Sequence, residues 1–214
     1  MSTQFSAAAG AVIPAPPPGF AALLERVIAE PARHARFVNT LSLMEYIGAR
    51  KILKSQPAAG FTLELLAHVS EEIRHAHALK RLALKLDPAV ETYAPEHLLA
   101  PAAASGYMQA VDRAAEADLA ATGAGAQPWV NYLYTTLLVE ERAGGFYPAY
   151  AERLAPLGHA AVIQGILREE ENHLRQVVDH LLQDDADGRA RLDRLRAVEA
   201  TAFAKWLAAL QQAA

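Results

Sequence analysis

Cysteine is absent from this chain of 214 residues. Its absence excludes disulfides, thiolate zinc sites, iron–sulfur clusters and a cysteine nucleophile. Any metal that the chain binds must therefore be held by oxygen and nitrogen ligands. The sequence also lacks an apolar run of 18 or more residues, so we expect no membrane-spanning segment.

The sequence also has no large excess of positive or negative charge. The formal net charge is -4, and no basic patch favours nucleic acid or an anionic membrane as a partner. The first basic residue is Arg26, so the amino-terminal segment lacks the positively charged start of a secretory signal. We therefore expect a cytoplasmic protein that binds neither nucleic acid nor a membrane.

The length and the apolar content of 52% suit one domain with a sizeable core. Residues 1–18 are rich in alanine and proline and end in the run Pro16-Pro17-Pro18. Such composition is typical of flexible or extended segments. We interpret residues 1–18 as a flexible arm and residues 19–214 as a single domain.

Strand signals are almost absent, while alanine, leucine, glutamate, arginine and glutamine dominate, which predicts an all-α fold. We expect Thr62 to cap a helix, Pro148 to kink one and Pro156 to open one. Two long helical hairpins joined by a crossover with its own helix are typical of four-helix bundles that hold metals. Breakers place the helices at about 19–30, 31–56, 62–86, 102–121, 128–154, 156–184 and 189–212.

Two of these helices carry the same pair of metal-ligating residue types. Glu72 and His75 are three positions apart, and Glu170 and His173 repeat that spacing. Residues three apart on a helix share one face. Apolar residues at helical spacing flank both pairs, so two carboxylates and two imidazoles should point into the core.

Two further helices each offer one carboxylate within an apolar stripe. Glu45 lies in the helix before Glu72, and Glu140 lies in the helix before Glu170. Glu141 competes with Glu140 for this role, and we prefer Glu140 because the face of Glu141 is less regular. The order of one glutamate followed by a Glu-x-x-His motif occurs twice, which indicates a duplicated helical hairpin.

Charge balance indicates two metal ions rather than one. Four buried carboxylates are very costly unless positive charge compensates them. Two divalent ions supply four positive charges, and carboxylate oxygens with imidazole nitrogens suit iron or manganese. The predicted ligands are Glu45, Glu72, His75, Glu140, Glu170 and His173.

His68 lies seven positions before His75 on the same helix face. We interpret it as a partly buried, hydrogen-bonded histidine, and an additional ligand or a hydrogen-bond partner of a ligand is the alternative. The neighbouring Glu71, Arg74 and Glu169 are expected to form ion pairs rather than to bind metal.

The six predicted ligands resemble the set found in the ferritin-like di-iron carboxylate proteins, in which two helices give a glutamate each and two give Glu-x-x-His. The segment from Glu71 to Ala76, Glu-Glu-Ile-Arg-His-Ala, is similar to rubrerythrin relatives. Val139-Glu140-Glu141-Arg142 loosely resembles the third-helix motif of tRNA-modifying di-iron hydroxylases. The resemblance covers roughly residues 33–182 and implies a ferritin-like bundle with two iron ions.

The resemblance also implies an oxidoreductase that activates dioxygen or peroxide. Our first hypothesis is hydroxylation or N-oxygenation of a small organic molecule. Iron oxidation or peroxide removal without an organic substrate is the alternative, and a structural bundle with an empty site is a third. Rubrerythrins carry an iron site held by four cysteines, which this chain lacks, so a redox reaction would need an external electron donor. Manganese remains an alternative metal, and the apolar face of the last helix allows a homodimer.

Overall fold

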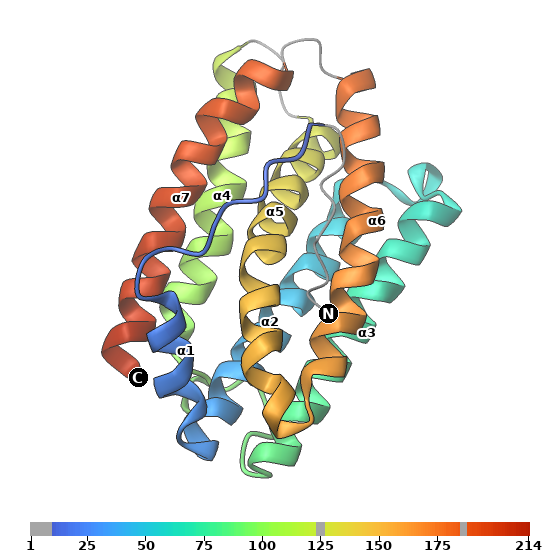
Figure 1. The fold of residues 1–214 in the computed structure, drawn as a ribbon. Coiled ribbons are helices and arrows are strands. Elements are labelled where there is room, and N and C mark those ends of the chain that lie inside the picture. The colour runs from blue at the N-terminus through green and yellow to red at the C-terminus, as the bar shows by residue number, and fades with distance from the viewer. Residues whose placement is uncertain (1–9, 123–126, 185–187) are drawn as a thin grey trace.

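The structure is a computed structural model that describes residues 10–122, 127–184 and 188–214. Within these ranges the chain forms seven α-helices, three short 3-10 helices and no strand (Figure 1). The all-α prediction is therefore confirmed, and the helices pack as a bundle. The α-helices are α1 (Phe20–Ile28), α2 (Pro31–Ser55), α3 (Leu63–Leu86), α4 (Pro101–Ala121), α5 (Pro128–Leu154), α6 (Ala160–Asp184) and α7 (Gly188–Ala213).

Local sequence explains where several helices begin. Helices α2, α4 and α5 begin at Pro31, Pro101 and Pro128. Proline is tolerated there because the backbone N–H of a first-turn residue has no acceptor within the helix, so its absence costs nothing. Thr62 caps α3 as predicted, and its hydroxyl accepts a hydrogen bond from the backbone N–H of Leu65 at 3.2 Å.

The prediction that Pro156 opens a long helix is wrong. Pro156 lies in a 3-10 helix, Ala155–Leu157, that directly follows α5. Gly158 then adopts a left-handed φ of 72°, which ends this turn, and α6 begins only at Ala160. Helix α5 continues through Pro148, and the kink expected there stays a prediction. Residues 123–126 and 185–187, where we expected a loop and a helix end, lie outside the described residues.

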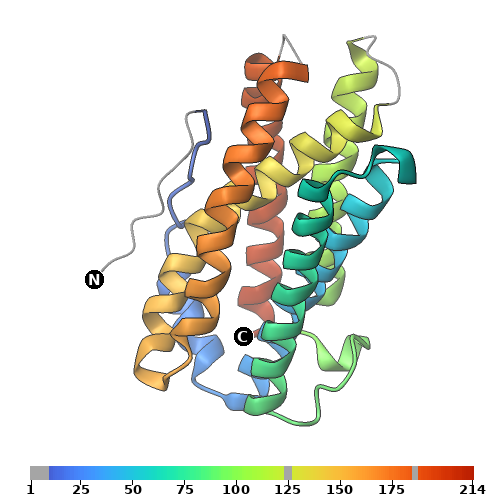
Figure 2. The same cartoon turned by 90° about the vertical axis from the view of Figure 1, so that its right-hand side faces the viewer.

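Two helical hairpins form the part of the bundle that concerns function. Helix α2 packs along α3, and α5 packs along α6; α2 also contacts α5, and α3 contacts α6. Helices α4 and α7 form a third pair that packs against α5 (Figures 1 and 2). The interior between α2, α3, α5 and α6 is therefore enclosed by helices from both halves of the sequence.

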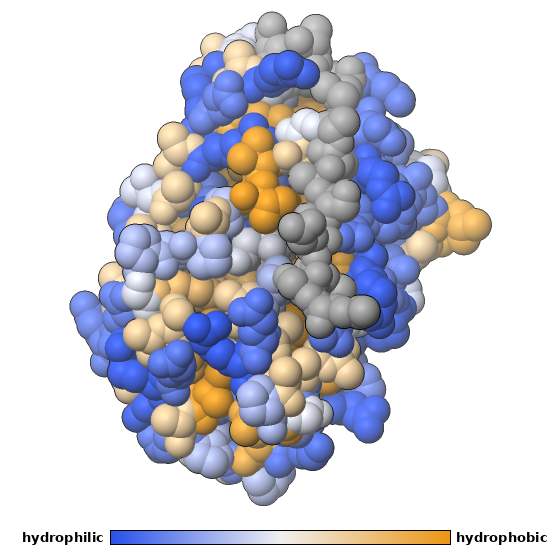
Figure 3. Space-filling view, viewed as in Figure 1, coloured by the Kyte–Doolittle hydropathy of each residue, from blue (hydrophilic) through white to orange (hydrophobic). Residues whose placement is uncertain are grey.

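The helices are amphipathic, with apolar side chains inside the bundle. Hydrophilic side chains cover much of the surface over α6 on the face seen in Figure 3. The apolar face of α7, including Phe203, Trp206 and Leu210, is buried, as expected for packing across the bundle. Among the described residues, no helix combines the length and hydropathy needed to cross a membrane.

The described part of the amino-terminal arm, residues 10–18, contains no helix or strand and runs over α5 toward α1 (Figure 1). The backbone N–H of Val12 donates a hydrogen bond of 2.7 Å to Glu141 on α5. A Cβ atom at Gly145 would lie 2.0 Å from the carbonyl oxygen of Pro14. Close contact between the arm and α5 therefore requires glycine at position 145.

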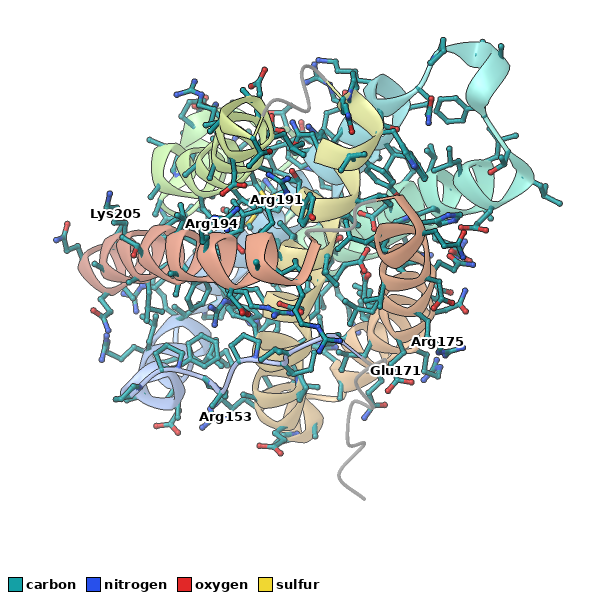
Figure 4. The ribbon with its side chains drawn as sticks, turned by 90° about the horizontal axis from the view of Figure 1, so that it is seen from above. Arg153, Glu171, Arg175, Arg191, Arg194 and Lys205 are labelled. Atoms are coloured by element: carbon teal, nitrogen blue, oxygen red, sulfur yellow. The ribbon has the colours of Figure 1, made fainter. Side chains whose placement is uncertain are left out.

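Ion pairs join the ends of α4 and α7. Arg191 and Arg194 lie on the side of α7 that faces α4, and both pair with Asp118 (Figure 4). Glu171 and Arg175 lie on the outer side of α6, away from the bundle centre (Figure 4). The charged residue Glu171 is thus separated from the interior side of α6.

Candidate metal centre

Histidine and glutamate side chains from four helices meet inside the bundle. They form two groups that could each hold a metal ion, and the candidate ligand atoms within a group all lie within 4.8 Å of one another. Glu72 belongs to both groups. The first group contains His68, Glu72, Glu140 and His173, and the second contains Glu45, Glu72, His75 and Glu170.

Each hairpin contributes to both groups because the helices present one face to the centre. Helix α2 supplies Glu45, and α5 supplies Glu140. Helices α3 and α6 supply the Glu-x-x-His pairs, whose spacing of three residues puts both side chains on the inner face. The structure thus brings all six predicted ligands together, together with His68. Their binding of metal stays a prediction.

The Nδ1 atoms of the two motif histidines face the carboxylates. His75 Nδ1 lies 3.2 Å from Glu170 and 4.0 Å from Glu45. His173 Nδ1 lies 3.1 Å from Glu170, 3.8 Å from Glu140 and 3.9 Å from Glu72. Glu170 contacts both histidines, so Glu170 and Glu72 are placed between the two halves of the cluster.

The Nε2 atoms of the same histidines face outward and pair across the two motif helices. His75 Nε2 lies 2.6 Å from Glu169 on α6, and His173 Nε2 lies 2.7 Å from Glu71 on α3. Arg74 in turn pairs with Glu169 at 2.7 Å. A carboxylate that accepts a hydrogen bond from Nε2–H keeps the proton on Nε2 and leaves Nδ1 of the neutral ring as the electron-pair donor, which is how metal-binding histidines are oriented.

His68 is hydrogen-bonded as predicted, and its binding of metal stays a prediction. Its Nδ1 atom is hydrogen-bonded to the hydroxyl of Tyr132 at 2.8 Å. Its Nε2 atom lies 3.4 Å from both Glu72 and Glu140. The ring also stacks on His173, with centroids 3.8 Å apart. His68 is therefore a buried, hydrogen-bonded histidine with its second nitrogen directed at the cluster.

Glu140 and its competitor Glu141 have different surroundings in the structure. Glu140 belongs to the first group, whereas Glu141 forms an ion pair with Arg196 on α7 at 2.6 Å. Glu141 also accepts the hydrogen bond from Val12 at 2.7 Å. Two partners on other segments therefore use the Glu141 carboxylate, while Glu140 faces the cluster.

Several polar atoms of the cluster lack hydrogen bonds although they are buried. Among the described residues, His75 Nδ1 and both carboxylate oxygens of Glu140 are in this condition. Leaving such atoms unpaired costs roughly 1–3 kcal/mol each, and more for charged groups. These atoms are good ligands for iron, manganese or zinc, so the donor set fits divalent metal ions.

The acid–base properties of the cluster reflect the same crowding. Burial alone would lower the pKa of His75, but Glu170 and Glu45 raise it to about 10. Burial raises the pKa of Glu140 to about 7 and that of Glu45 well above its ordinary value. Burial also opposes ionisation of Glu170, but the neighbouring His173 and His75 hold the pKa of Glu170 below its ordinary value. In the metal-free cluster, bound protons therefore offset the negative charge of the carboxylates, and metal ions would have to displace these protons.

A cavity of about 410 Å³ adjoins the cluster and is lined by residues from α2, α3, α4, α5, α6 and α7. Glu45, Glu72, Glu140 and Glu170 form part of its wall. This volume lies within the range of roughly 300–1,000 Å³ that is typical of small-molecule sites. The cluster is thus accessible to a small molecule that enters the cavity.

Two residues shape the Glu45 side of the cavity. The hydroxyl of Tyr147 donates a hydrogen bond to Glu45. A Cβ atom at Gly48 would lie 2.8 Å from a Glu72 oxygen, so glycine leaves room for that carboxylate. Sequence reasoning did not identify Tyr132 as the partner of His68, because their separation along the chain gives no local signal.

The proposed relationship to ferritin-like proteins rests on these residues and their arrangement. The fold and the two His/Glu groups agree with a metal-binding bundle, and they leave the connection to that family as a resemblance. No protein-family model, curated protein or solved structure matches the chain in the comparisons with known proteins.

Proposed function

We propose that this chain is a di-metal oxidoreductase of the ferritin-like type that holds two iron ions and uses dioxygen to oxidise a small organic molecule. The observation that carries this proposal is the pair of buried His/Glu groups that share Glu72. The unpaired atoms of His75 and Glu140 support it, because coordination would give them partners.

The contacts suggest how the side chains would divide between the ions. Glu45 and His75 would hold one ion, and Glu140 and His173 would hold the other. Glu72 and Glu170 would reach both ions, since Glu72 belongs to both groups and Glu170 contacts both histidines. His68 would add a nitrogen to the ion held by Glu140.

A pair of iron ions supplies the capacity to activate dioxygen, with electrons from an external donor. The protein contributes a buried, shaped environment. Glu71 and Glu169 fix the orientation of the histidine rings through Nε2. Tyr147 donates a hydrogen bond to Glu45 and so orients the one ligand that is only partly buried.

The cavity favours an organic substrate over iron storage. Its wall combines the cluster glutamates with apolar residues such as Met44, Val139 and Phe146. Pockets that bind small organic molecules are mainly apolar with a few convergent polar groups. A protein that only oxidises or stores iron has no need of such a wall.

Oxygen consumption tests this function directly. Protein loaded anaerobically with iron(II) should consume dioxygen in proportion to its bound iron when air is admitted. The Glu72→Ala variant should consume little, because the substitution removes a ligand common to both groups. An oxygen electrode and the optical spectrum, recorded before and after mixing, give independent readings.

The control is Glu141→Ala, which changes the adjacent carboxylate that pairs with Arg196. This variant should retain most of the iron and most of the oxygen consumption. Equal oxygen consumption by the parent protein and Glu72→Ala would overturn the proposal.

A further inference from the structure

The cavity beside the cluster is elongated. Its lining on α5 extends from Thr135 to Tyr147. At about 1.5 Å per residue, these positions are about 18 Å apart along the helix. Glu140 lies between them, so a molecule in the cavity would pass the cluster rather than end at it.

One end of the cavity is positively charged. Arg50, Lys51 and Lys54 from the carboxyl-terminal part of α2 contribute to its lining. The acidic lining residue Asp112 on α4 pairs with Lys51. Two positive charges therefore remain at this end, and Lys54 is exposed to solvent there.

The opposite end is aromatic and almost fully buried. Trp206 stacks on Phe146, with ring centroids 6.1 Å apart, and both residues line the cavity. Trp206 is 2% exposed and Phe146 is 5% exposed, so this end of the cavity offers an enclosed aromatic surface.

We propose that the cavity binds an elongated apolar monocarboxylate. Its carboxylate lies beside Arg50 and Lys54, and its apolar body extends past Glu140 toward Phe146 and Trp206. The assignment of this ligand as a substrate rests on the proposed function, but its binding does not. A positive end and an apolar interior favour an amphipathic anion over a neutral or cationic molecule of the same size.

Calorimetric titration with three probes of equal length tests the proposal: octanoate, octanamide and octylamine. We use the full chain both loaded with iron(II) under anaerobic conditions and free of metal. Octanoate should bind at least about tenfold more tightly than octanamide, and octylamine should bind most weakly. An equal affinity of octanoate and octanamide, or a preference for octylamine, would overturn the proposal.

A charge reversal locates the carboxylate. Lys54→Glu should weaken octanoate binding about tenfold and leave octanamide unaffected. The matched control is Lys85→Glu, because Lys85 is also an exposed lysine in the last turn of its helix but does not line the cavity. A preference for octanoate that survives Lys54→Glu would show that another group, such as the metal, holds the carboxylate, and would also overturn the proposal.

The outcomes separate this inference from the proposed function. Octanoate binding that depends on Lys54 in a chain that takes up no iron would refute the di-metal function alone. Iron-dependent oxygen consumption without a preference for octanoate would refute the ligand class alone.

Discussion

Two buried polar regions of this protein differ in how completely their charges are paired. Between α4, α5 and α7, Glu199 receives hydrogen bonds from Arg142 at 2.8 and 2.6 Å and from Tyr107 at 2.8 Å. The Arg142 guanidinium also lies 4.2 Å from the ring centroid of Phe203. In the cluster between the two hairpins, His75 Nδ1 and both oxygens of Glu140 have no hydrogen bond with any residue that the structure describes.

The difference shows how a structural polar network can be distinguished from a binding site. The Glu199 network satisfies both carboxylate oxygens with groups of the protein itself, so it needs no external ligand. The cluster contains more carboxylates than its neighbours can satisfy and leaves good metal-ligand atoms unpaired. Substitutions in the two regions should therefore respond differently to metal.

The largest expected effect concerns the coupling of metal to stability. Iron(II) at about 100 times its Kd stabilises a protein by roughly 2.7 kcal/mol per independent site. Two sites together contribute roughly 5.4 kcal/mol. The melting temperature of the parent protein should therefore rise by about 10–20 °C, at about 2–4 °C per kcal/mol for a chain of this size. Glu72→Ala should lose most of this rise in a calorimetric scan. A full rise in the variant would remove Glu72 from the ligand set.

Glu199→Ala should destabilise the protein whether or not metal is present. It leaves the Arg142 guanidinium buried without its partner, which costs about 3 kcal/mol or more. Urea denaturation of the metal-free protein measures this loss. Iron content per folded chain should not change, and a loss of iron comparable to that in Glu72→Ala would contradict the separation of the two regions.

His34 is a buried histidine with no carboxylate partner in the described part of the chain, and it shows what burial does to such a side chain. Burial, assisted by the charge of His159, lowers the pKa of His34 to about 4, and its Nε2 atom is hydrogen-bonded to Tyr150 at 2.7 Å. The unfolded chain takes up this proton near pH 6.5 and the folded chain near pH 4. The contribution of neutral His34 to the free energy of unfolding is therefore complete above about pH 6.5 and declines as the pH falls toward 4, by roughly 3 kcal/mol in all.

Urea denaturation of the metal-free parent protein and of His34→Gln between pH 7.5 and 4 measures this effect. The difference in stability between the two should shrink as the pH falls through that window. A difference that stays constant would show that the pKa of His34 is not lowered.

The smallest expected effect comes from adding one methyl group beside the cluster. Gly48→Ala would crowd a Glu72 oxygen and should weaken iron binding about tenfold, as measured by competition with a chelator. Gly106→Ala is the matched control, because a Cβ atom there meets nothing within 4 Å. The control should leave iron affinity unchanged and stabilise α4 by roughly 0.5–1 kcal/mol. Equal iron affinity in Gly48→Ala would show that the Glu72 carboxylate can move aside.

The features that could be predicted from the sequence are those with a local signal. Helix periodicity and breakers predicted the helices, and the spacing of Glu72 with His75 predicted a shared inner face. The start of α6 could not be predicted from Pro156, because Pro156 is equally compatible with a 3-10 turn that Gly158 ends. Pro156 indicated that a helix boundary lies nearby, but it did not indicate whether the residues after it begin α6 or form a turn.

Pairings between distant segments had no local signal. Glu140 and Glu141 are neighbours, and only the position of Arg196 on α7 and of Val12 in the arm distinguishes their surroundings. The role of His68 likewise depends on Tyr132 and His173, which lie on other helices. Such contacts depend on the packing of the helices, which periodicity within one helix does not specify.

Elemental analysis of metal-loaded protein tests the central claim most directly. The chain should be purified, loaded anaerobically with iron(II) and freed of excess metal, alongside the His173→Ala and Glu141→Ala variants. We expect about two iron ions per parent chain and per Glu141→Ala chain, as two divalent ions balance four glutamates. We expect His173→Ala to retain fewer than about one, since it removes a ligand atom from the first group. Fewer than about one iron in the parent chain, or unchanged iron in His173→Ala, would contradict the account.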